Sequence, residues 1–236
     1  MTLNLSSDEN AGTSALPERD RVRRPGRWQS PWLLGLGVLV VTNLLYALPR
    51  YLQFDPKLSR DPILAGYPLQ FPLIVAHLLA GNIAMVTVFL QVTAWVRRRH
   101  PAVHRISGRL YVFAGALPAA LLGLYLVPAL PTPTGQVGLV TEAVLWIATT
   151  LTGFRMARAG NYAAHRRWML YSFALALGTT WSRVLYLMEL AVPALALPSD
   201  VYLEVTSWLG WMINLLIAHW WLQRRRPAVP ARGSSA

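Results

Sequence analysis

Long apolar runs separated by short polar segments make up the chain from residue 31 to residue 223. A helix needs about 20 mostly apolar residues to cross the hydrocarbon core of a membrane. Six runs reach or approach this length, and we expect a helix at each of them: 32–48, 72–96, 110–130, 137–157, 168–192 and 203–222. The pattern predicts an all-α fold, a polytopic transmembrane helical bundle of six helices whose core is formed by the second to fifth helices.

Lys and Arg residues are distributed unevenly over the segments between these runs. The N-terminal segment, the loops after the second and fourth runs and the C-terminal segment hold most of them, whereas the opposite loops hold only Arg50, Lys57 and Arg60. Short segments rich in Lys and Arg stay on the cytoplasmic side of a membrane, so both termini are predicted to be cytoplasmic. Residues 1–30 are polar and are expected to form a disordered cytoplasmic tail, and residues 224–236 a basic cytoplasmic tail.

The composition supports a membrane protein, since 54% of the residues are hydrophobic and only 14% are charged. The net charge of +12 does not indicate nucleic acid as a partner, because the basic residues lie in short loops and form no stripe on a water-soluble face. Membrane lipids are the partner that this distribution favours. The chain has no Cys, which excludes disulfides, thiolate metal sites, iron–sulfur clusters and covalently attached c-type haem.

Two patterns predict how the helices pack. Gly115, Ala119 and Gly123 recur at every fourth position of the third run, so a neighbouring backbone can approach this line of small side chains closely. On the second run, His77 and Gln91 lie on one helical face. Lipid disfavours polar side chains, so we expect this face to point into the bundle.

A His followed by an Arg opens two helices after a predicted cytoplasmic loop, as His104-Arg105 and as His165-Arg166. Basic side chains and free amide groups at the start of a helix bind lipid phosphates. A neutral imidazole can instead be an axial ligand of haem iron, and His219, near the cytoplasmic end of the last run, is a further candidate for that role. The residues leave both interpretations open, lipid phosphate and haem b.

Three ionisable residues, His77, Glu142 and Arg183, are predicted in the outer part of the bilayer on different helices. An unpaired charge in hydrocarbon is costly, so groups of this kind have partners and often a function. One interpretation is a structural polar network that fixes the helices relative to one another. The alternatives are an outward-facing pocket for a ligand or quinone and a path for protons.

Several of these motifs occur in an order that resembles DUF2306, a bacterial family of multi-pass membrane proteins named as a domain of unknown function. The residues that carry the resemblance are 76–81, Gln91, 97–101, His104-Arg105, 108–111, 165–169 and Arg183. The similarity extends over about residues 72–186 and departs from the family pattern at 88–92, where a segment like Gly-Pro-Leu-Gln-Phe is expected, and at Tyr171, where an Arg is expected. The resemblance implies an integral protein of the bacterial inner (cytoplasmic) membrane without an assigned activity.

No motif in the sequence identifies a reaction. Gly-x-Ser-x-Gly, His-Glu-x-x-His and a Gly-rich phosphate loop are missing, which argues against hydrolases, proteases and kinases, and there is no confident metal site. We expect a protein that binds a small ligand or lipid within the helix bundle. The alternative is a haem b or quinone-linked electron-transfer protein that uses His104, His165 or His219. A homo-oligomer and a soluble partner are left open.

Overall fold

The computed structural model describes residues 31–59, 63–64 and 66–224. Within these ranges the chain forms helices, turns and loops and no strand. The α-helices are α1 (Pro31–Tyr51), α2 (Gln70–Val92), α3 (Ala94–Arg99), α4 (Pro101–Leu110), α5 (Leu117–Leu126), α6 (Gln136–Arg158), α7 (Tyr162–Ala176), α8 (Thr179–Ala191) and α9 (Ser199–Arg224). The two expected cytoplasmic tails lie outside the described residues, apart from Arg224.

Shorter elements complete the chain. A stretch of π-helix, η2 (Tyr111–Ala116), joins α4 and α5 into one continuous span, which a 3-10 turn, η3 (Val127–Ala129), extends beyond α5. Two further 3-10 turns, η1 (Pro56–Leu58) and η4 (Pro193–Leu195), lie in loops.

Five helices of the described chain are long and apolar enough to cross a membrane: Pro31–Tyr51, Gln70–Val92, Pro101–Ala129, Gln136–Arg158 and Ser199–Arg224. They confirm the helices predicted at all but one of the apolar runs. The remaining run, 168–192, is divided between α7 and α8, which have 15 and 13 residues. The all-α membrane fold is therefore confirmed, whereas the sixth crossing and the orientation of the termini stay predictions.

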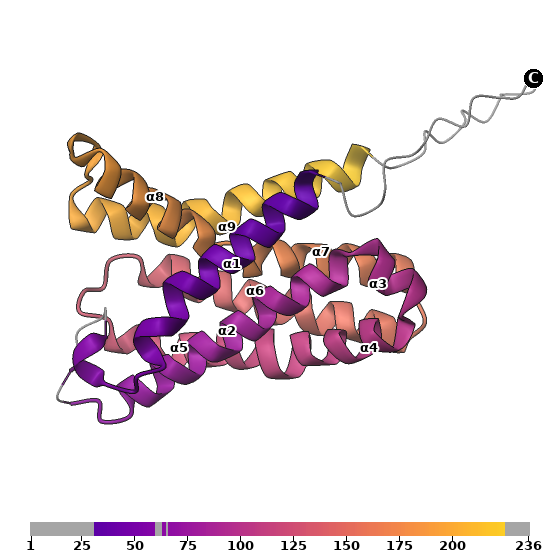
Figure 1. Cartoon of the computed structure of the whole chain (residues 1–236), viewed down its shortest axis with the longest axis horizontal. Helices are drawn as coiled ribbons and strands as arrows, with labels where there is room; N and C mark the ends of the chain where they lie inside the picture. The colour runs from indigo at the N-terminus through magenta and orange to yellow at the C-terminus, as the bar shows by residue number, and fades with distance from the viewer. Residues whose placement is uncertain (1–30, 60–62, 65, 225–236) are drawn as a thin grey trace, which may run out of the picture.

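The helices that surround the main core lie side by side along the long axis of the molecule (Figure 1). They are α2, the α4–η2–α5 span, α6 and α7, while α1 lies against α2 and α8 lies against α9. Side chains from α2, η2 and α7 form the core cluster of Ala84, Val88, Tyr111, Val112, Ala116, Met169, Phe173 and Ala176. Trp146 and Phe154 of α6 pack against this cluster, so the core comes from the second to fifth predicted helices, as the sequence indicates, but only from the first half of the fifth.

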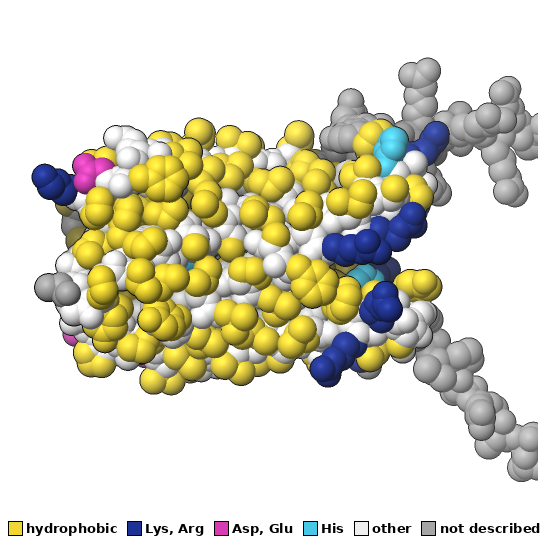
Figure 2. Space-filling view, turned by 90° about the horizontal axis from the view of Figure 1, so that it is seen from below, with side chains coloured by type: hydrophobic (Ala, Val, Ile, Leu, Met, Phe, Trp, Pro, Cys, Tyr) yellow, Lys and Arg dark blue, Asp and Glu magenta, His cyan; other side chains and the backbone are white. Residues whose placement is uncertain are grey.

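Both ends of the described chain lie toward the same end of the bundle. The first turn of α1, the last turn of α9, the segment between α2 and α4 and the α6–α7 loop are all toward the right in Figure 1. We call this the basic end because it carries Arg97, Arg98, Arg99, Arg105, Arg158, Arg166, Arg167 and Arg224. On the face that Figure 2 shows, hydrophobic side chains cover most of the surface between the two ends, and the charged side chains lie at the ends. This apolar belt is what helices surrounded by lipid require.

The chain reverses direction at the basic end through a helix break and a proline. Helix α2 ends where Thr93 adopts an extended backbone conformation, with φ −69° and ψ 111°. Pro101 then occupies the first turn of α4, where its fixed φ fits a helix and its missing N–H is not needed. The intervening α3 carries Arg97, Arg98 and Arg99, so the reversal places three basic side chains together.

The line of small residues on the third span packs against α2, as the sequence predicts. A Cβ atom added to Gly115 would lie 2.9 Å from the backbone of Ala84. Farther along the span, Ala119 O lies 2.9 Å from His77 Nδ1, and a Cβ atom on Gly123 would lie 3.3 Å from the same imidazole. The small side chains thus allow α2 to approach so closely that His77 bonds to a backbone carbonyl.

The break between α7 and α8 lies where two other helices press against the chain. A Cβ atom added to Gly178 would overlap Glu142 Oε1 of α6 and would lie 3.1 Å from Trp211 Cβ of α9. From the other side, a Cβ atom on Gly210 would lie 2.5 Å from Gly178 O. Glycine at both positions therefore lets α9 pack on the bend.

Candidate functional site

A groove lies between α6, α7 and α9. It has room for about 400 Å³ and is lined by Leu145, Thr149, Tyr171, Leu175, Trp211, Met212, Leu215, Leu216 and His219. Most of these side chains are apolar, and Met212 and Leu216 are also exposed on the surface of α9. A groove of this kind, open toward the lipid phase, suits an apolar chain.

The polar residues Tyr171 and His219 mark the part of the groove nearest the basic end. Tyr171 Oη lies 3.0 Å from His219 Nδ1, and Gln223 Nε2 lies 3.2 Å from His219 Nε2. The Gln223 amide nitrogen can only donate, so Nε2 of a neutral His219 accepts this bond and Nδ1–H donates to Tyr171. The hydroxyl hydrogen of Tyr171 is then available to donate to a ligand.

Basic and aromatic side chains flank this end of the groove. The guanidinium of Arg166 on α7 lies 5.5 Å from the centre of the Trp221 ring, and that of Arg224 lies 3.7 Å from the centre of the Trp220 ring. These cation–π contacts hold positive charge beside aromatic rings, an arrangement typical of the membrane interface. The groove therefore combines an apolar length with a polar, positively charged end.

Two helices bring His104 and His165 to the same level. Helices α4 and α7 both enter the bundle from the basic end, and farther along them Tyr111 Oη lies 2.6 Å from Ser172 Oγ. His104 lies seven residues before Tyr111, and His165 lies seven residues before Ser172. Seven residues make two helical turns, roughly 10 Å, and return to the same helix face. In agreement with this register, the two imidazoles lie within range of each other's charge.

The ring nitrogens of these two histidines differ in their partners. Nδ1 of His165 lies 2.8 Å from Gly153 O of α6. Nδ1 of His104 is buried and has no hydrogen-bond partner among the described residues. The guanidinium groups of Arg97 and Arg105 also lie within electrostatic range of His104. Figure 2 shows a hollow at the basic end in which a histidine lies between Lys or Arg side chains.

A cluster of buried hydroxyl groups lies where η2 meets α6 and α7. Ser172 Oγ contacts Tyr111 Oη at 2.6 Å and Thr150 Oγ1 at 2.7 Å, and Trp146 Nε1 donates to Tyr111 Oη at 3.0 Å. Tyr111, Thr150 and Ser172 are fully buried. The sequence alone does not reveal this cluster, because the mutual rotation of three helices decides which hydroxyl groups meet. The signal in the sequence that points to the cluster is spacing, because Tyr111 and Ser172 each follow a histidine of the repeated His-Arg motif by seven residues.

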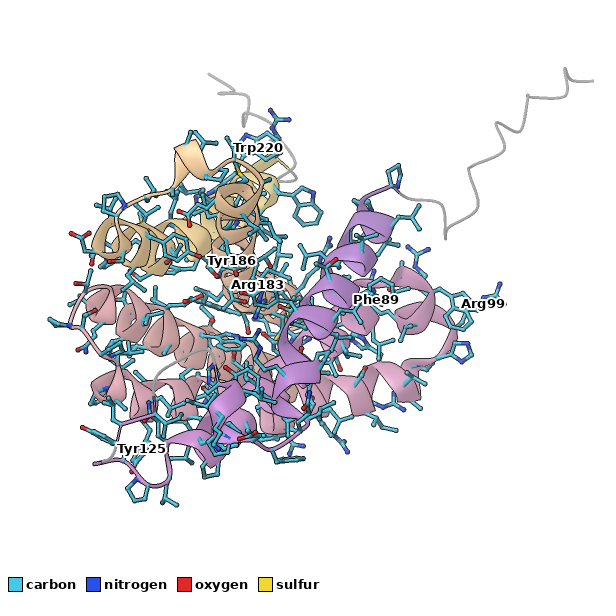
Figure 3. All side chains as sticks on the ribbon, turned by 60° about the vertical axis from the view of Figure 1, so that its left-hand side comes forward. Phe89, Arg99, Tyr125, Arg183, Tyr186 and Trp220 are labelled. Carbon is cyan, nitrogen blue, oxygen red and sulfur yellow. The ribbon has the colours of Figure 1, made fainter. Side chains whose placement is uncertain are left out.

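The three predicted intramembrane ionisable residues contact different helices. His77 bonds to Ala119 O, and Glu142 lies against Gly178. Figure 3 shows Arg183 and Tyr186 of α8 in the region beside α1. There the Arg183 guanidinium lies 5.3 Å from the centre of the Tyr46 ring.

These contacts with separate helices do not test whether His77, Glu142 and Arg183 form one polar network. The predicted polar network thus stays a prediction. Arg105 and Arg166, the partners of the two histidines in the sequence motif, are exposed at the basic end. Tyr171, the position at which the chain departs from the family pattern, belongs to the groove instead.

Comparison with known proteins identifies the family of this chain and no individual relative. The family model of DUF2306, described as a predicted membrane protein, matches residues 74–222, which is more than half of the chain. Curated proteins and solved structures give no significant match. The family match reaches farther than the 72–186 expected from the motifs and includes the part of α9 that lines the groove. The chain belongs to the DUF2306 family of predicted membrane proteins.

Proposed function

We propose that this protein binds an anionic membrane phospholipid in the groove between α6, α7 and α9. The observation that carries the proposal is the division of the groove into an apolar length and a polar pair, Tyr171 and His219, beside the basic end. An acyl chain would lie against Leu145, Leu175 and Trp211. The phosphate would accept a hydrogen bond from Tyr171 and lie near the charge at the basic end.

The headgroup contacts decide the affinity in this proposal. Lipid tails are as apolar as the groove, so an acyl chain gains little by moving from the bilayer into it. A hydrogen bond to a charged group contributes about 1.5–3 kcal/mol. Selectivity for an anionic headgroup therefore depends on Tyr171, His219 and the arginines around them.

The proposal includes a location and an orientation. The basic end faces the cytoplasm of a bacterium, because positively charged segments are retained there. The bound phosphate then belongs to the cytoplasmic leaflet of the inner membrane, which is rich in anionic lipids.

Native mass spectrometry of the protein in mild detergent, titrated with phosphatidylglycerol and with phosphatidylcholine, tests this function. We expect one phosphatidylglycerol to bind in preference to phosphatidylcholine. Tyr171→Phe keeps the ring but removes the donor, so binding should weaken about 10-fold or more, as expected from the loss of a bond of about 1.5–3 kcal/mol. Tyr125→Phe is the matched control, since Tyr125 is exposed and lies outside the groove.

A second pair of variants tests the apolar length. Met212→Trp should fill the groove and weaken binding, whereas Leu209→Trp should not, because Leu209 is exposed to a similar extent on α9 but does not line the groove. Equal binding by all these variants, or equal affinity for both lipids, would contradict the proposal.

A further inference from the structure

We infer that Glu142 of α6 is a proton-binding site within the helix bundle, at the break between α7 and α8. Its ligand is a single proton, which Glu142 holds as a neutral carboxylic acid and releases when the carboxyl ionises. Glu142 is not among the residues that line the groove, so this inference does not rest on the binding of a lipid.

Glu142 lies well inside a helix that is long and apolar enough to cross the membrane. It follows the first residue of α6 by six positions and precedes the last by 16, which places it roughly 9 Å and 24 Å from the two ends. The residues one turn away on the same helix face carry no charge: Gly138, Leu139, Leu145 and Trp146. A carboxylate at this depth needs a partner, because an unpaired charge in hydrocarbon is costly.

The carboxyl of Glu142 meets the bend between α7 and α8 and the neighbouring part of α9. A Cβ atom added to Gly178, at the bend, would overlap Glu142 Oε1. The same added atom would lie 3.1 Å from Trp211 Cβ of α9 and 3.1 Å from Leu175 O. The carboxyl oxygen therefore lies beside backbone, a carbonyl group and an aromatic side chain.

The groups that surround this oxygen offer no hydrogen-bond donor to a carboxylate. The N–H of Gly178 donates to Leu175 O at 2.8 Å, and Trp211 Nε1 donates to Ser207 O at 2.7 Å. Within the described part of the chain, Glu142 forms no ion pair and accepts no hydrogen bond. A carboxylate can only accept hydrogen bonds, whereas a carboxylic acid can donate one to a carbonyl oxygen. Apolar surroundings without donors thus favour the protonated form.

The titratable side chains nearest to this carboxyl along α7 and α9 contact other groups. Tyr171 and His219 bond to each other in the groove, with 3.0 Å between their polar atoms. The Glu204 carboxylate accepts a bond from Gly135 N at 2.8 Å. None of these three side chains supplies a countercharge to Glu142.

Arg183 of α8 is the countercharge in the alternative interpretation, a polar network. Its guanidinium lies 5.3 Å from the centre of the Tyr46 ring of α1, and Nη1 lies 3.4 Å from Thr179 Oγ1. If Arg183 paired with Glu142, the carboxyl would be ionised, and loss of one partner would leave the other charge uncompensated. The two interpretations predict opposite protonation states of the same carboxyl, so experiment can separate them.

Dicyclohexylcarbodiimide, a lipid-soluble reagent, tests whether Glu142 of the full chain in lipid vesicles carries a proton. The carboxyl O–H adds across one C=N bond of the reagent, so that the proton moves to nitrogen and the oxygen bonds to the central carbon. The O-acylisourea then rearranges to a stable N-acylurea without loss of any atom. We expect one adduct per chain, located at Glu142 by peptide mass spectrometry, and less labelling as the pH is raised. Glu142→Gln should abolish the adduct, whereas Glu204→Gln, which changes an exposed carboxylate, should keep it.

Infrared spectroscopy and thermal unfolding add readouts that do not depend on access of the reagent. The difference spectrum between wild type and Glu142→Gln should contain the C=O band of a protonated carboxylic acid. Glu142→Gln has the shape of the neutral acid, so it should unfold at the wild-type temperature or above.

Three results would overturn the inference. One is a folded wild-type protein that gives neither the adduct nor the acid band. Another is a difference spectrum that contains the bands of an ionised carboxylate in place of the acid band. The third is a lowered unfolding temperature in Glu142→Gln that Arg183→Gln restores in the double variant, because this coupling would show an ion pair.

Discussion

At the scale of single residues, position in the bundle decides what each polar group does. Tyr111 and Ser172 lie two turns deeper than His104 and His165, are fully buried, and satisfy each other's hydrogen bonds. Such groups hold helices together, because hydrocarbon offers no water to replace a lost bond. The two histidines lie nearer the end of the bundle, where Nδ1 of His165 bonds to Gly153 O and Nδ1 of His104 is buried without a hydrogen-bond partner among the described residues.

Tyr111→Phe tests the structural role of the hydroxyl cluster. The substitution removes the partner of Ser172 Oγ and Trp146 Nε1 while it keeps the ring in the core. We expect a loss of about 1 kcal/mol in unfolding free energy, the scale of a hydrogen bond between membrane helices. Thermal unfolding in detergent measures it, with Tyr125→Phe as the exposed control. Unchanged stability would show that the cluster does not hold η2 to α7.

The sequence allowed the histidine candidates to be predicted but not their relative depth in the bundle. His104 and His165 stand out because the same His-Arg motif opens two helices. Their common depth depends on the packing of η2 against α7, which the sequence does not specify. Tyr171 is a site residue that the sequence does not indicate. The sequence marks it only as a departure from the family pattern, whereas the structure places it in the groove.

At the scale of elements, small residues determine where helices touch. Gly115 allows the backbone of α2 to lie against η2, and Gly178 with Gly210 allows α9 to pack on the bend between α7 and α8. The apolar pattern predicted five of the long helices correctly, because length and hydrophobicity are enough for a span. It missed the break at Gly178, because the run contains no proline there and the cause lies in neighbouring helices.

Gly115→Ala and Gly81→Ala form a matched pair that tests the helix contact. A Cβ atom on Gly115 would meet the Ala84 backbone at 2.9 Å, whereas one on Gly81 has nothing within 4 Å. Overpacking costs about 1–3 kcal/mol, so Gly115→Ala should lower the unfolding temperature. Gly81→Ala should leave it unchanged or raise it, because Ala favours a helix by about 1 kcal/mol over Gly. The reverse order would mean that α2 and η2 are not in contact.

At the scale of the whole molecule, charge and hydrophobicity define one axis. The apolar belt lies between two polar ends, and arginines gather at the end where the described chain begins and finishes. Both ends of the described chain lie at the same end of the bundle. An even number of crossings, which the sequence predicts, would give this arrangement. The number itself depends on whether α7 and α8 together cross the membrane.

Single cysteines test the six-crossing topology without background, since the chain has no Cys. Thr132, Ala159 and Ala196 are exposed in successive loops. With six crossings, a maleimide that cannot cross membranes should label Thr132→Cys and Ala196→Cys in intact cells, and Ala159→Cys only after the membrane is opened. If Ala196→Cys also reacts only after opening, α7 and α8 do not form a crossing.

Photo-crosslinking tests the central claim, a phospholipid in the groove, most directly. The protein would be placed in nanodiscs that contain a phosphatidylglycerol with a diazirine in its acyl chain, and the modified residues would be identified by mass spectrometry. We predict crosslinks concentrated on the groove residues of α6, α7 and α9, reduced by unlabelled phosphatidylglycerol and by Met212→Trp. Crosslinks spread evenly over the exposed residues of all helices, and insensitive to both, would contradict it.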